Sequence, residues 1–299
     1  MGSVRIWRLT VEKLIKEKIA SLLSEKEDII SVEQLGGMTN QNYLVKTTVN
    51  QYIVKFFGKG TDKLINRQAE KYNLELLKDL HLDVENYLFD IEAGIKVNQY
   101  IENAETLDST IIKTKFEKIA PILQTIHASG KELKGEFAPF DEIKKYESLI
   151  QGEISYPNYE TVRKLVFSLK DQLEEIGIDK KSCHIDLVPE NFIEAPDGHL
   201  YLIDWEYSSM NDPMWDLAAL FLESEFTPEE EENFLAYYES EKTPVSRSKI
   251  RIYKILQDII WSLWTIYKEA NGANFGDYGI SRYNRAVKEL DFKGGSYEN

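Results

Sequence analysis

Hydrophobic and polar residues follow different periods in the two parts of this chain. Between residues 31 and 57 they alternate, which predicts antiparallel strands because side chains two apart on a strand share a face. Helical spacing precedes and follows this stretch, and two more strands come after it. The predicted elements are a helix over 11–23, strands within 31–57, a helix over 62–80 and a strand pair within 88–101.

After residue 103 the pattern becomes mostly helical, with a single strand pair near 192–204. The predicted helices cover 110–128, 141–150, 159–176 and 247–270. No low-complexity linker and no internal repeat separates the two parts. The pattern therefore predicts an α+β protein with two lobes, a small antiparallel-sheet N-lobe over 1–98 and a larger helical C-lobe over 99–299.

Composition and charge exclude several classes of protein. The chain has 42% hydrophobic and 29% charged residues, as folded globular proteins do. Its 36 basic and 51 acidic residues give a net charge of −15, which argues against nucleic acid or an anionic membrane as the main partner. We expect no membrane insertion, because no run of 18 apolar residues occurs. The single cysteine, Cys183, and the lack of a signal peptide favour a cytoplasmic protein, while the oligomeric state stays open.

The polar segment HIDLVPEN, residues 184–191, carries the first candidate chemistry. Asp186 could accept the proton of a substrate hydroxyl, and Asn191, five residues later, could bind a metal ion. Taken alone, the segment is equally typical of a turn in which both side chains bond the backbone.

A second segment, HLYLIDWEY at 199–207, strengthens the first. We expect Asp204 at the end of a strand that pairs with the strand after Asn191. Asp204 and Glu206 would then share one face, with Trp205 on the other. Carboxylate and amide oxygens suit Mg²⁺, so Asn191, Asp204 and Glu206 are the predicted ligands.

The N-lobe offers groups that could hold phosphates. Gly36 and Gly37 lie between two predicted strands, where backbone amides can approach phosphate oxygens. Lys55 is the lone charge of an apolar strand, and Glu70 on the next helix could pair with it. An edge lysine and a solvated glutamate are the ordinary alternatives. The predicted nucleotide-binding residues are Gly36, Gly37, Met38, Thr39, Asn40, Lys55, Glu70 and, at an adenine-binding hinge, Asn98, Gln99, Tyr100 and Ile101.

The order of these parts resembles that of the protein-kinase-like superfamily, over the whole chain. Ile185 stands where protein kinases have an arginine, and the glycine loop departs from their G-x-G-x-x-G pattern. Only eleven residues separate Asp204 from Asp216, too few for an activation segment. The pattern is similar instead to the aminoglycoside phosphotransferase and choline kinase branch, which acts on small alcohols.

The choice of alcohol rests on aromatic residues downstream. Choline has a quaternary ammonium without N–H groups, so a protein recognises it through aromatic faces and nearby negative charge. Trp261 and Trp264 project from one face of a long helix, although large aromatics on a buried helix are often simply core. This W-x-x-W segment and DWEYSSMN resemble the LicA-type choline kinases of bacteria. The resemblance implies a choline site of Trp205, Tyr207, Trp215, Glu223, Trp261 and Trp264, with Glu223 as counter-charge.

The resemblance further implies an activity, cofactors and roles. The protein would use ATP and Mg²⁺ to phosphorylate choline, and the phosphocholine would decorate cell-surface glycopolymers. Asp186 would deprotonate the hydroxyl, Lys55, held by Glu70, would contact the phosphates, and His184 would hold the loop. An ethanolamine or aminoglycoside phosphotransferase is the alternative enzyme. A kinase-like binding module is the alternative outside enzymes, but it would be expected to lack one of the four residues Lys55, Asp186, Asn191 and Asp204, all of which are present.

Overall fold

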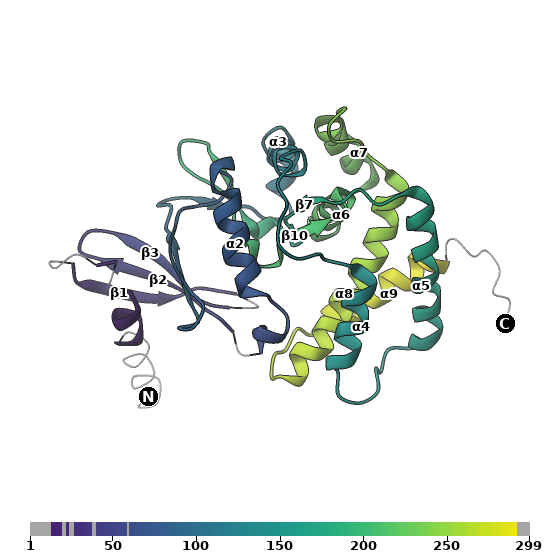
Figure 1. Cartoon of the computed structure of the whole chain (residues 1–299), viewed down its shortest axis with the longest axis horizontal. Helices are drawn as coiled ribbons and strands as arrows, with labels where there is room; N and C mark the ends of the chain where they lie inside the picture. Colours follow the sequence, from purple (N-terminus) through teal and green to yellow (C-terminus); the bar gives the residue numbers. More distant parts are fainter. Residues whose placement is uncertain (1–12, 20–21, 24–26, 38–39, 59, 292–299) are drawn as a thin grey trace. The chain divides into compact units, whose positions relative to one another are not determined.

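A computed structural model describes residues 13–19, 22–23, 27–37, 40–58 and 60–291 of the chain (Figure 1). These residues form two compact units. The first comprises Met1–Thr106 together with Phe192–Glu206, and the second Leu107–Asn191 together with Tyr207–Asn299. Both strands and helices are present, so the predicted α+β class is confirmed.

The first unit is built on a five-stranded antiparallel sheet in the order β1-β2-β3-β5-β4. Its strands are β1 (Ile29–Gln34), β2 (Gln41–Thr47), β3 (Gln51–Phe56), β4 (Asn86–Asp90) and β5 (Ile95–Gln99). One face buries Val45, Val54 and Val97 against Ile15 and Ile19 of the helical segment 13–19. The alternate positions are therefore on the other face, where polar side chains gather.

Helix α2 (Arg67–Leu77) follows β3 and is shorter than the helix predicted over 62–80. Asn66 caps its first turn by accepting a hydrogen bond from the backbone N–H of Ala69 at 3.1 Å. Short 3-10 turns at Thr61–Lys63 and Lys78–Leu80 occupy the rest of the predicted span. The capping of α2 places Arg67 and Glu70 on its buried side.

A hairpin from later in the chain belongs to the first unit. Strands β8 (Phe192–Glu194) and β9 (Leu200–Leu202) pair with each other, and β8 also pairs with β6 (Glu105–Thr106). Because of this pairing, residues 192–206 belong to the first unit rather than to the helical second unit. The predicted lobes, 1–98 and 99–299, stay a prediction, since a compact unit need not coincide with a functional lobe.

The second unit is helical apart from the strand pair β7 (Lys181–Cys183) and β10 (Ser209–Asn211). Helices α3 (Phe116–His127), α4 (Pro139–Leu149), α5 (Tyr159–Ile176) and α8 (Arg247–Ala270) match the predicted spans closely. The sequence patterns missed α7 (Pro228–Tyr238) and α9 (Tyr278–Asp291) and gave no bounds for α6 (Pro213–Glu223). None of the helices in the described ranges is long and apolar enough to cross a membrane.

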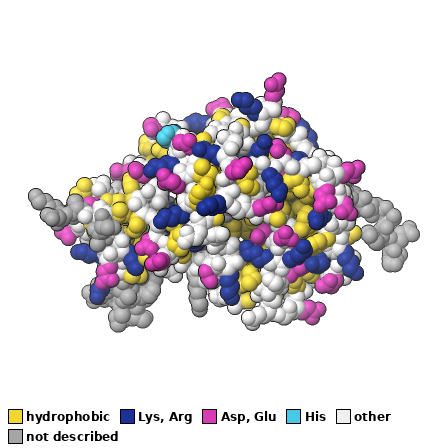
Figure 2. Space-filling model, in the orientation of Figure 1, with side chains coloured by type: hydrophobic (Ala, Val, Ile, Leu, Met, Phe, Trp, Pro, Cys, Tyr) yellow, Lys and Arg dark blue, Asp and Glu magenta, His cyan; other side chains and the backbone are white. Residues whose placement is uncertain are grey.

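Charged side chains of both signs cover the surface. On the face drawn in Figure 2, lysine and arginine are interspersed with aspartate and glutamate and form no large area of one sign. The net charge of −15 is therefore spread over the visible face rather than gathered in a patch there.

Candidate active site

The loop that carries Asp186 begins directly after β7 and is held by helix α6. Asp216 accepts hydrogen bonds from the backbone N–H groups of His184 and Ile185, both at 2.8 Å. Trp215 adds a third bond, from its indole N–H to the carbonyl of Ile185 at 3.0 Å. Ile185 has a φ of 78°, a left-handed conformation that a β-branched residue rarely adopts. These bonds hold the loop in a strained shape.

Asp216 is itself part of a buried network in the second unit. The imidazole of His127 lies 3.0 Å from the Asp216 carboxylate and 2.7 Å from the Tyr238 hydroxyl. Sequence reasoning used Asp216 only as a landmark and did not assign it this role. His184 is completely buried, and its backbone N–H takes part in holding the loop. The predicted role of the His184 side chain stays a prediction.

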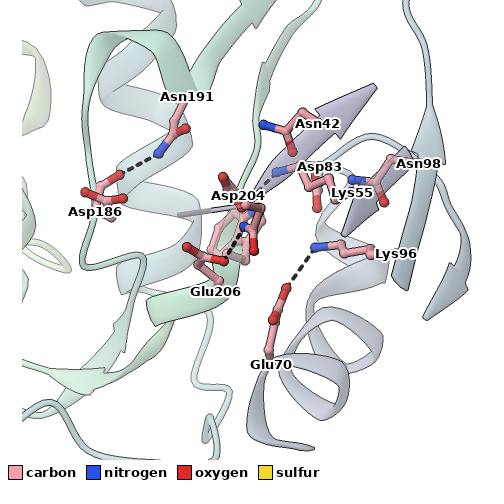
Figure 3. Close-up of polar contacts among 12 residues, drawn as sticks. Asn42, Lys55, Glu70, Asp83, Lys96, Asn98, Asp186, Asn191, Asp204 and Glu206 are labelled. Carbon is pink, nitrogen blue, oxygen red and sulfur yellow. Dashed lines mark hydrogen bonds and ion pairs between the residues drawn. The ribbon is translucent and has the colours of Figure 1, made fainter. Parts of the chain in front are cut away.

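Asn191 is bound to the same loop. Its side-chain amide donates to the backbone carbonyl of Asp186 at 2.9 Å, as Figure 3 shows. This bond fixes the amide plane and assigns the nitrogen to the loop, which leaves the oxygen as the atom suited to a metal. The carboxylate of Asp186 lies within electrostatic range of two tyrosines of the second unit. Burial raises the pKa of Tyr146 and of Tyr278, and the charge of Asp186 raises both further.

Asp204 and Glu206 do not lie on a strand, so the predicted shared strand face is wrong. Strand β9 ends at Leu202, and Asp204 turns the chain with a φ of 68°. A 3-10 turn, Trp205–Tyr207, follows at once and contains Glu206. Asp204 forms an ion pair with Lys55 at 2.9 Å and keeps 26% of its side-chain surface exposed.

The predicted pair of Lys55 with Glu70 is also wrong. Glu70 instead pairs with Lys96 at 3.0 Å and with Arg67 at 2.6 Å, as the dashed line to Lys96 in Figure 3 shows. The reason lies in the sheet register, because Lys55 on β3 is directly opposite Lys96 on β5. Two cations on one face compete for the carboxylates nearby, and Glu70 goes to Lys96 while Asp204 goes to Lys55.

Asp83 is a further acidic group near these lysines, and the sequence patterns did not single it out. Burial raises the pKa of Asp83 to about 6, although Lys96 and Lys55 both lower it. The attraction of Glu70 and Asp83 raises the pKa of Lys96 even though burial opposes this. Lys96 is therefore a fixed positive charge in the interior of the first unit.

A buried network around Arg67 joins three distant segments of the first unit. Arg67 donates to Glu70 at 2.6 Å, to Glu206 at 2.9 Å and to the side-chain oxygen of Asn40 at 3.0 Å. Asn40 in turn donates to Glu206 at 2.8 Å, and the guanidinium lies 4.1 Å from the ring centre of Phe57. Burial raises the pKa of Glu206, as does Asp204, and Arg67 opposes both. Sequence reasoning missed Arg67 entirely.

The glycine loop is anchored at both ends of its described part. Met38 and Thr39 lie outside the described residues. Asn42 donates to the carbonyl of Gly36 at 2.8 Å, and a Cβ atom at Gly37 would come within 2.6 Å of that same amide. Only glycine fits at residue 37 for this reason. The side chain of Asn40 points into the Arg67 network, so it anchors the loop.

The predicted hinge residues begin two positions after Lys96, at the end of β5. Asn98 accepts a hydrogen bond from Asn86 at 2.8 Å, and the backbone N–H of Gln99 donates to Glu85 at 2.8 Å. Tyr100 and Ile101 come directly after the strand and are partly exposed. Their role in binding adenine stays a prediction.

The chemistry of the donors fits Mg²⁺ at two of the three predicted ligands. Asp204 offers a partly exposed carboxylate, and Asn191 offers an amide oxygen. One oxygen of Glu206 already accepts from Arg67 and Asn40, and the side chain is almost fully buried. Glu206 therefore fits as a ligand only if this arrangement changes.

Aromatic side chains form a cluster in the second unit. The ring of Trp261 lies 5.8 Å from Tyr207 and 6.4 Å from Trp264, and both pairs are nearly perpendicular. Phe275 continues the cluster at 4.9 Å from Trp264, and Tyr278 follows at 6.5 Å from Phe275. Phe275 and Tyr278 were not predicted, because the segment that carries them was not recognised as the start of a helix.

Two of the predicted choline-binding tryptophans are core residues. Trp215 is fully buried, packs against Phe137 and Tyr253, and bonds the loop at Ile185. Trp205 is 1% exposed and donates its indole N–H to the carbonyl of Leu202 at 2.8 Å. Trp261 and Trp264 are buried as well, at 8% and 6% exposed, so burial alone does not separate the four tryptophans and their assignment to choline stays a prediction.

Glu223 is paired with a cation from helix α9. Its carboxylate lies 2.6 Å from Arg282, whose guanidinium also donates to the Tyr278 hydroxyl at 2.7 Å. Arg282 reaches Asp258 at 3.1 Å, and Arg285 binds the same carboxylate through two bonds of 2.6 Å. The predicted counter-charge is present, but it is already compensated. The sequence signal that was missed is the spacing of four between Tyr278 and Arg282.

Comparisons with known proteins identify the family of the chain. A family model described as choline/ethanolamine kinase matches residues 32–251. The protein LicA of Haemophilus influenzae is 32% identical over 273 residues, covering 88% of this chain and 80% of LicA. The crystal structure of choline kinase LicA from Streptococcus pneumoniae is 76% identical with a TM-score of 0.92, covering 95% of this chain and 99% of that one. A structure of LicA in complex with AMP is 77% identical with a TM-score of 0.90, covering 94% and 98%.

Proposed function

Because the chain belongs to the choline/ethanolamine kinase family, we propose that it is a choline kinase, which transfers the γ-phosphoryl group of ATP to the hydroxyl of choline. The observation that carries the choice of choline is the cluster of Tyr207, Trp261 and Trp264, which lies in the same unit as Asp186. The 76% identity to a choline kinase supports the same substrate.

Asp186 is the residue that acts on the alcohol. Its carboxylate orients the choline hydroxyl and takes its proton as the oxygen attacks the γ-phosphorus, while the bond to the β-phosphate oxygen breaks and ADP leaves. Asp216 and Trp215 keep Asp186 in place through the backbone of the loop. Positioning of this kind supplies much of the rate of a phosphoryl transfer.

The first unit supplies the groups for the nucleotide. Lys55, which holds Asp204 in this structure, contacts the phosphates, and the backbone of the glycine loop covers them. Lys96 and Arg67 fix Glu70 and the loop rather than the substrate. The adenine lies at Asn98–Ile101. An LicA structure that contains AMP supports nucleotide binding here.

Mg²⁺ is the proposed metal, held by Asp204 and Asn191. When bound, it neutralises charge on the transferring phosphates. Glu206 contributes to the shape of this region through Arg67 and Asn40. It becomes a ligand only if those bonds open.

Choline binds through ring faces and compensated negative charge. The methylated ammonium has no hydrogen to donate, so the faces of Tyr207, Trp261 and Trp264 supply attraction without demanding directional bonds. Phe275 and Tyr278 extend the same aromatic surface. The use of phosphocholine on a surface glycopolymer stays a prediction from the resemblance.

An ADP-release assay with choline, ethanolamine and an aminoglycoside panel tests the proposal. We expect choline to give the highest kcat/KM and the aminoglycosides no release above background. Asp186→Asn, which keeps the shape of the side chain, serves as the control and should abolish release while ATP binding persists. Faster turnover of ethanolamine or of an aminoglycoside would contradict choline as the substrate.

A further inference from the structure

Alternating charges connect the aromatic cluster to the interior of the second unit. Glu223, Arg282, Asp258 and Arg285 follow one another with contacts of 2.6, 3.1 and 2.6 Å. The two inner members are almost fully buried, with 5% of the Arg282 side chain and 3% of the Asp258 side chain exposed. The two ends reach solvent, with 17% of the Glu223 side chain and 43% of the Arg285 side chain exposed.

Arg282 has two contacts that matter for a ligand. One of its nitrogens, Nη1, donates both to Glu223 at 2.6 Å and to the Tyr278 hydroxyl at 2.7 Å. Its guanidinium carbon also lies 5.1 Å from the Tyr278 ring centre. Tyr278 is joined to Trp264 through Phe275, so Arg282 fixes one end of the aromatic cluster. Arg282 is therefore placed to control both a ring and a carboxylate.

Arg285, rather than Arg282, is the main hydrogen-bonding partner of Asp258. Arg285 already binds both oxygens of Asp258 at 2.6 Å, which is the strongest geometry an arginine can offer a carboxylate. The charge of Arg282 is thus available to Glu223. Burial is the main reason why the pKa of Tyr278 is raised; Arg282 lowers this pKa, and Glu223 and Asp186 raise it, so Tyr278 feels both members of the Arg282–Glu223 pair.

Choline and ethanolamine differ in what they require from such a carboxylate. The ammonium of ethanolamine has three N–H donors and, once removed from water, must find acceptors for them. The ammonium of choline has none, and aromatic faces suffice. Arg282 takes one oxygen of Glu223 and compensates its charge, which makes this carboxylate a weaker acceptor for ethanolamine without penalising choline.

We propose that Arg282 is a positioning residue that sets selectivity for choline over ethanolamine, by occupying Glu223 and holding Tyr278 against the aromatic cluster. The inference rests on the proposed function and deepens it. It names the residue that discriminates between the two amino alcohols of the family, and it assigns Glu223 an indirect role.

The test compares kcat/KM for choline and ethanolamine in the full-length protein. Arg282→Met removes the charge and the donors but keeps the length of the side chain. We expect the ethanolamine-to-choline ratio of kcat/KM to rise at least tenfold, mainly through a lower KM for ethanolamine. Arg285→Met is the matched control, because Arg285 contacts Asp258 and neither Glu223 nor Tyr278, and its ratio should stay within twofold of the original.

A second substitution separates the two effects of Arg282. The double variant Arg282→Met/Glu223→Gln also lacks the Glu223 carboxylate that the loss of Arg282 would set free. The rise in kcat/KM for ethanolamine should therefore disappear. A folded Arg282→Met variant with an unchanged ratio would overturn the proposal. If the original protein does not phosphorylate choline at all, the proposed function fails instead, and the two failures are distinct.

Glu223→Gln alone keeps the inference testable if Arg282→Met does not fold. With Arg282 in place, the loss of Glu223 leaves an uncompensated cation beside the pocket, which repels both amines alike. We expect the KM for choline and for ethanolamine to rise by similar factors. A rise confined to ethanolamine would mean that Glu223 accepts directly from its ammonium, which contradicts the role assigned to Arg282.

Discussion

Asp216→Asn should separate the positioning of the catalytic loop from its chemistry. The carboxylate accepts three hydrogen bonds in the buried second unit, from His184, Ile185 and His127, at 2.8, 2.8 and 3.0 Å. An asparagine keeps one oxygen and places an NH₂ group where the other oxygen was. At least one buried N–H group then faces another donor, so its bond is lost.

The cost follows from these contacts. A hydrogen bond to a charged group contributes roughly 1.5–3 kcal/mol, and leaving the buried donor unpaired costs a further 1–3 kcal/mol or so. Ile185 sits in a left-handed conformation that stores roughly 1–3 kcal/mol and is held by these same bonds. We therefore expect a loss of about 3 kcal/mol in stability and relaxation of the loop around Ile185. Misplacement of the catalytic group by about 1 Å costs on the order of 100-fold in rate.

The assay is steady-state ADP release together with thermal unfolding. We expect kcat to fall at least 100-fold, with the KM for ATP within threefold because the proposed nucleotide groups lie in the first unit. Asp212→Asn is the matched control, since Asp212 is equally buried on the same helix start and bonds Lys249 and Met214 instead of the loop. It should lower the melting temperature and leave kcat near normal. A folded Asp216→Asn protein with kcat within threefold of the original would refute the reasoning.

Three further outcomes are expected. Arg67→Gln should raise the KM for ATP about tenfold and leave the KM for choline unchanged. Adding Asn40→Ala to this variant should raise the KM for ATP little further, because both residues act through the same bonds, and additive effects would contradict a shared network. Asp83→Asn should stabilise the nucleotide-free protein by up to roughly 3 kcal/mol at pH 8 and by nothing at pH 4. The pKa of Asp83, about 6, exceeds the ordinary 3.8, so ionised Asp83 destabilises the folded protein; this destabilisation appears as pH rises between those values and is complete above them. Urea unfolding measures the gain, and an equal gain in the free energy of unfolding at both pH values would contradict this explanation. Trp264→Ala should raise the KM for choline far more than for ethanolamine, because only choline depends on ring faces, and equal effects would remove the ring from the site.

The sequence predicted the order of the parts better than their contacts. Alternation found strands β1 to β5, and the spacing of Asp186 and Asn191 found the loop, because both depend on residues near one another in the chain. The family was predicted from the resemblance to choline kinases, and the family match over residues 32–251 confirms it. The bounds of helix α6 were not predicted even though Asp212 and Pro213 are a good helix start, since its apolar residues surround the helix and show no period.

Contacts between side chains far apart in the sequence could not be predicted. Arg67 is the first residue of α2 and looks like a surface cation, yet its partners Asn40 and Glu206 are 27 and 139 positions away. The conformation of Ile185 could not be predicted either, because a β-branched residue rarely adopts a left-handed φ. Only the bonds from Asp216 and Trp215 explain why that conformation persists.

The exchange of partners between the two lysines follows from one fact about the sheet. Lys55 and Lys96 are directly opposite on β3 and β5, so both project from the same face of the sheet and repel each other. Each needs its own carboxylate, and burial decides which. Glu70 is almost fully buried and takes Lys96, which is buried as well, whereas Asp204 is a quarter exposed and takes Lys55. The lysine whose partner is more accessible to solvent is the one that can exchange that partner for a phosphate at the lower cost. Lys55 is therefore the lysine we propose for the substrate contact, and Lys96 the fixed structural charge, even though the pairing of Lys55 with Glu70 taken from the kinase pattern was wrong.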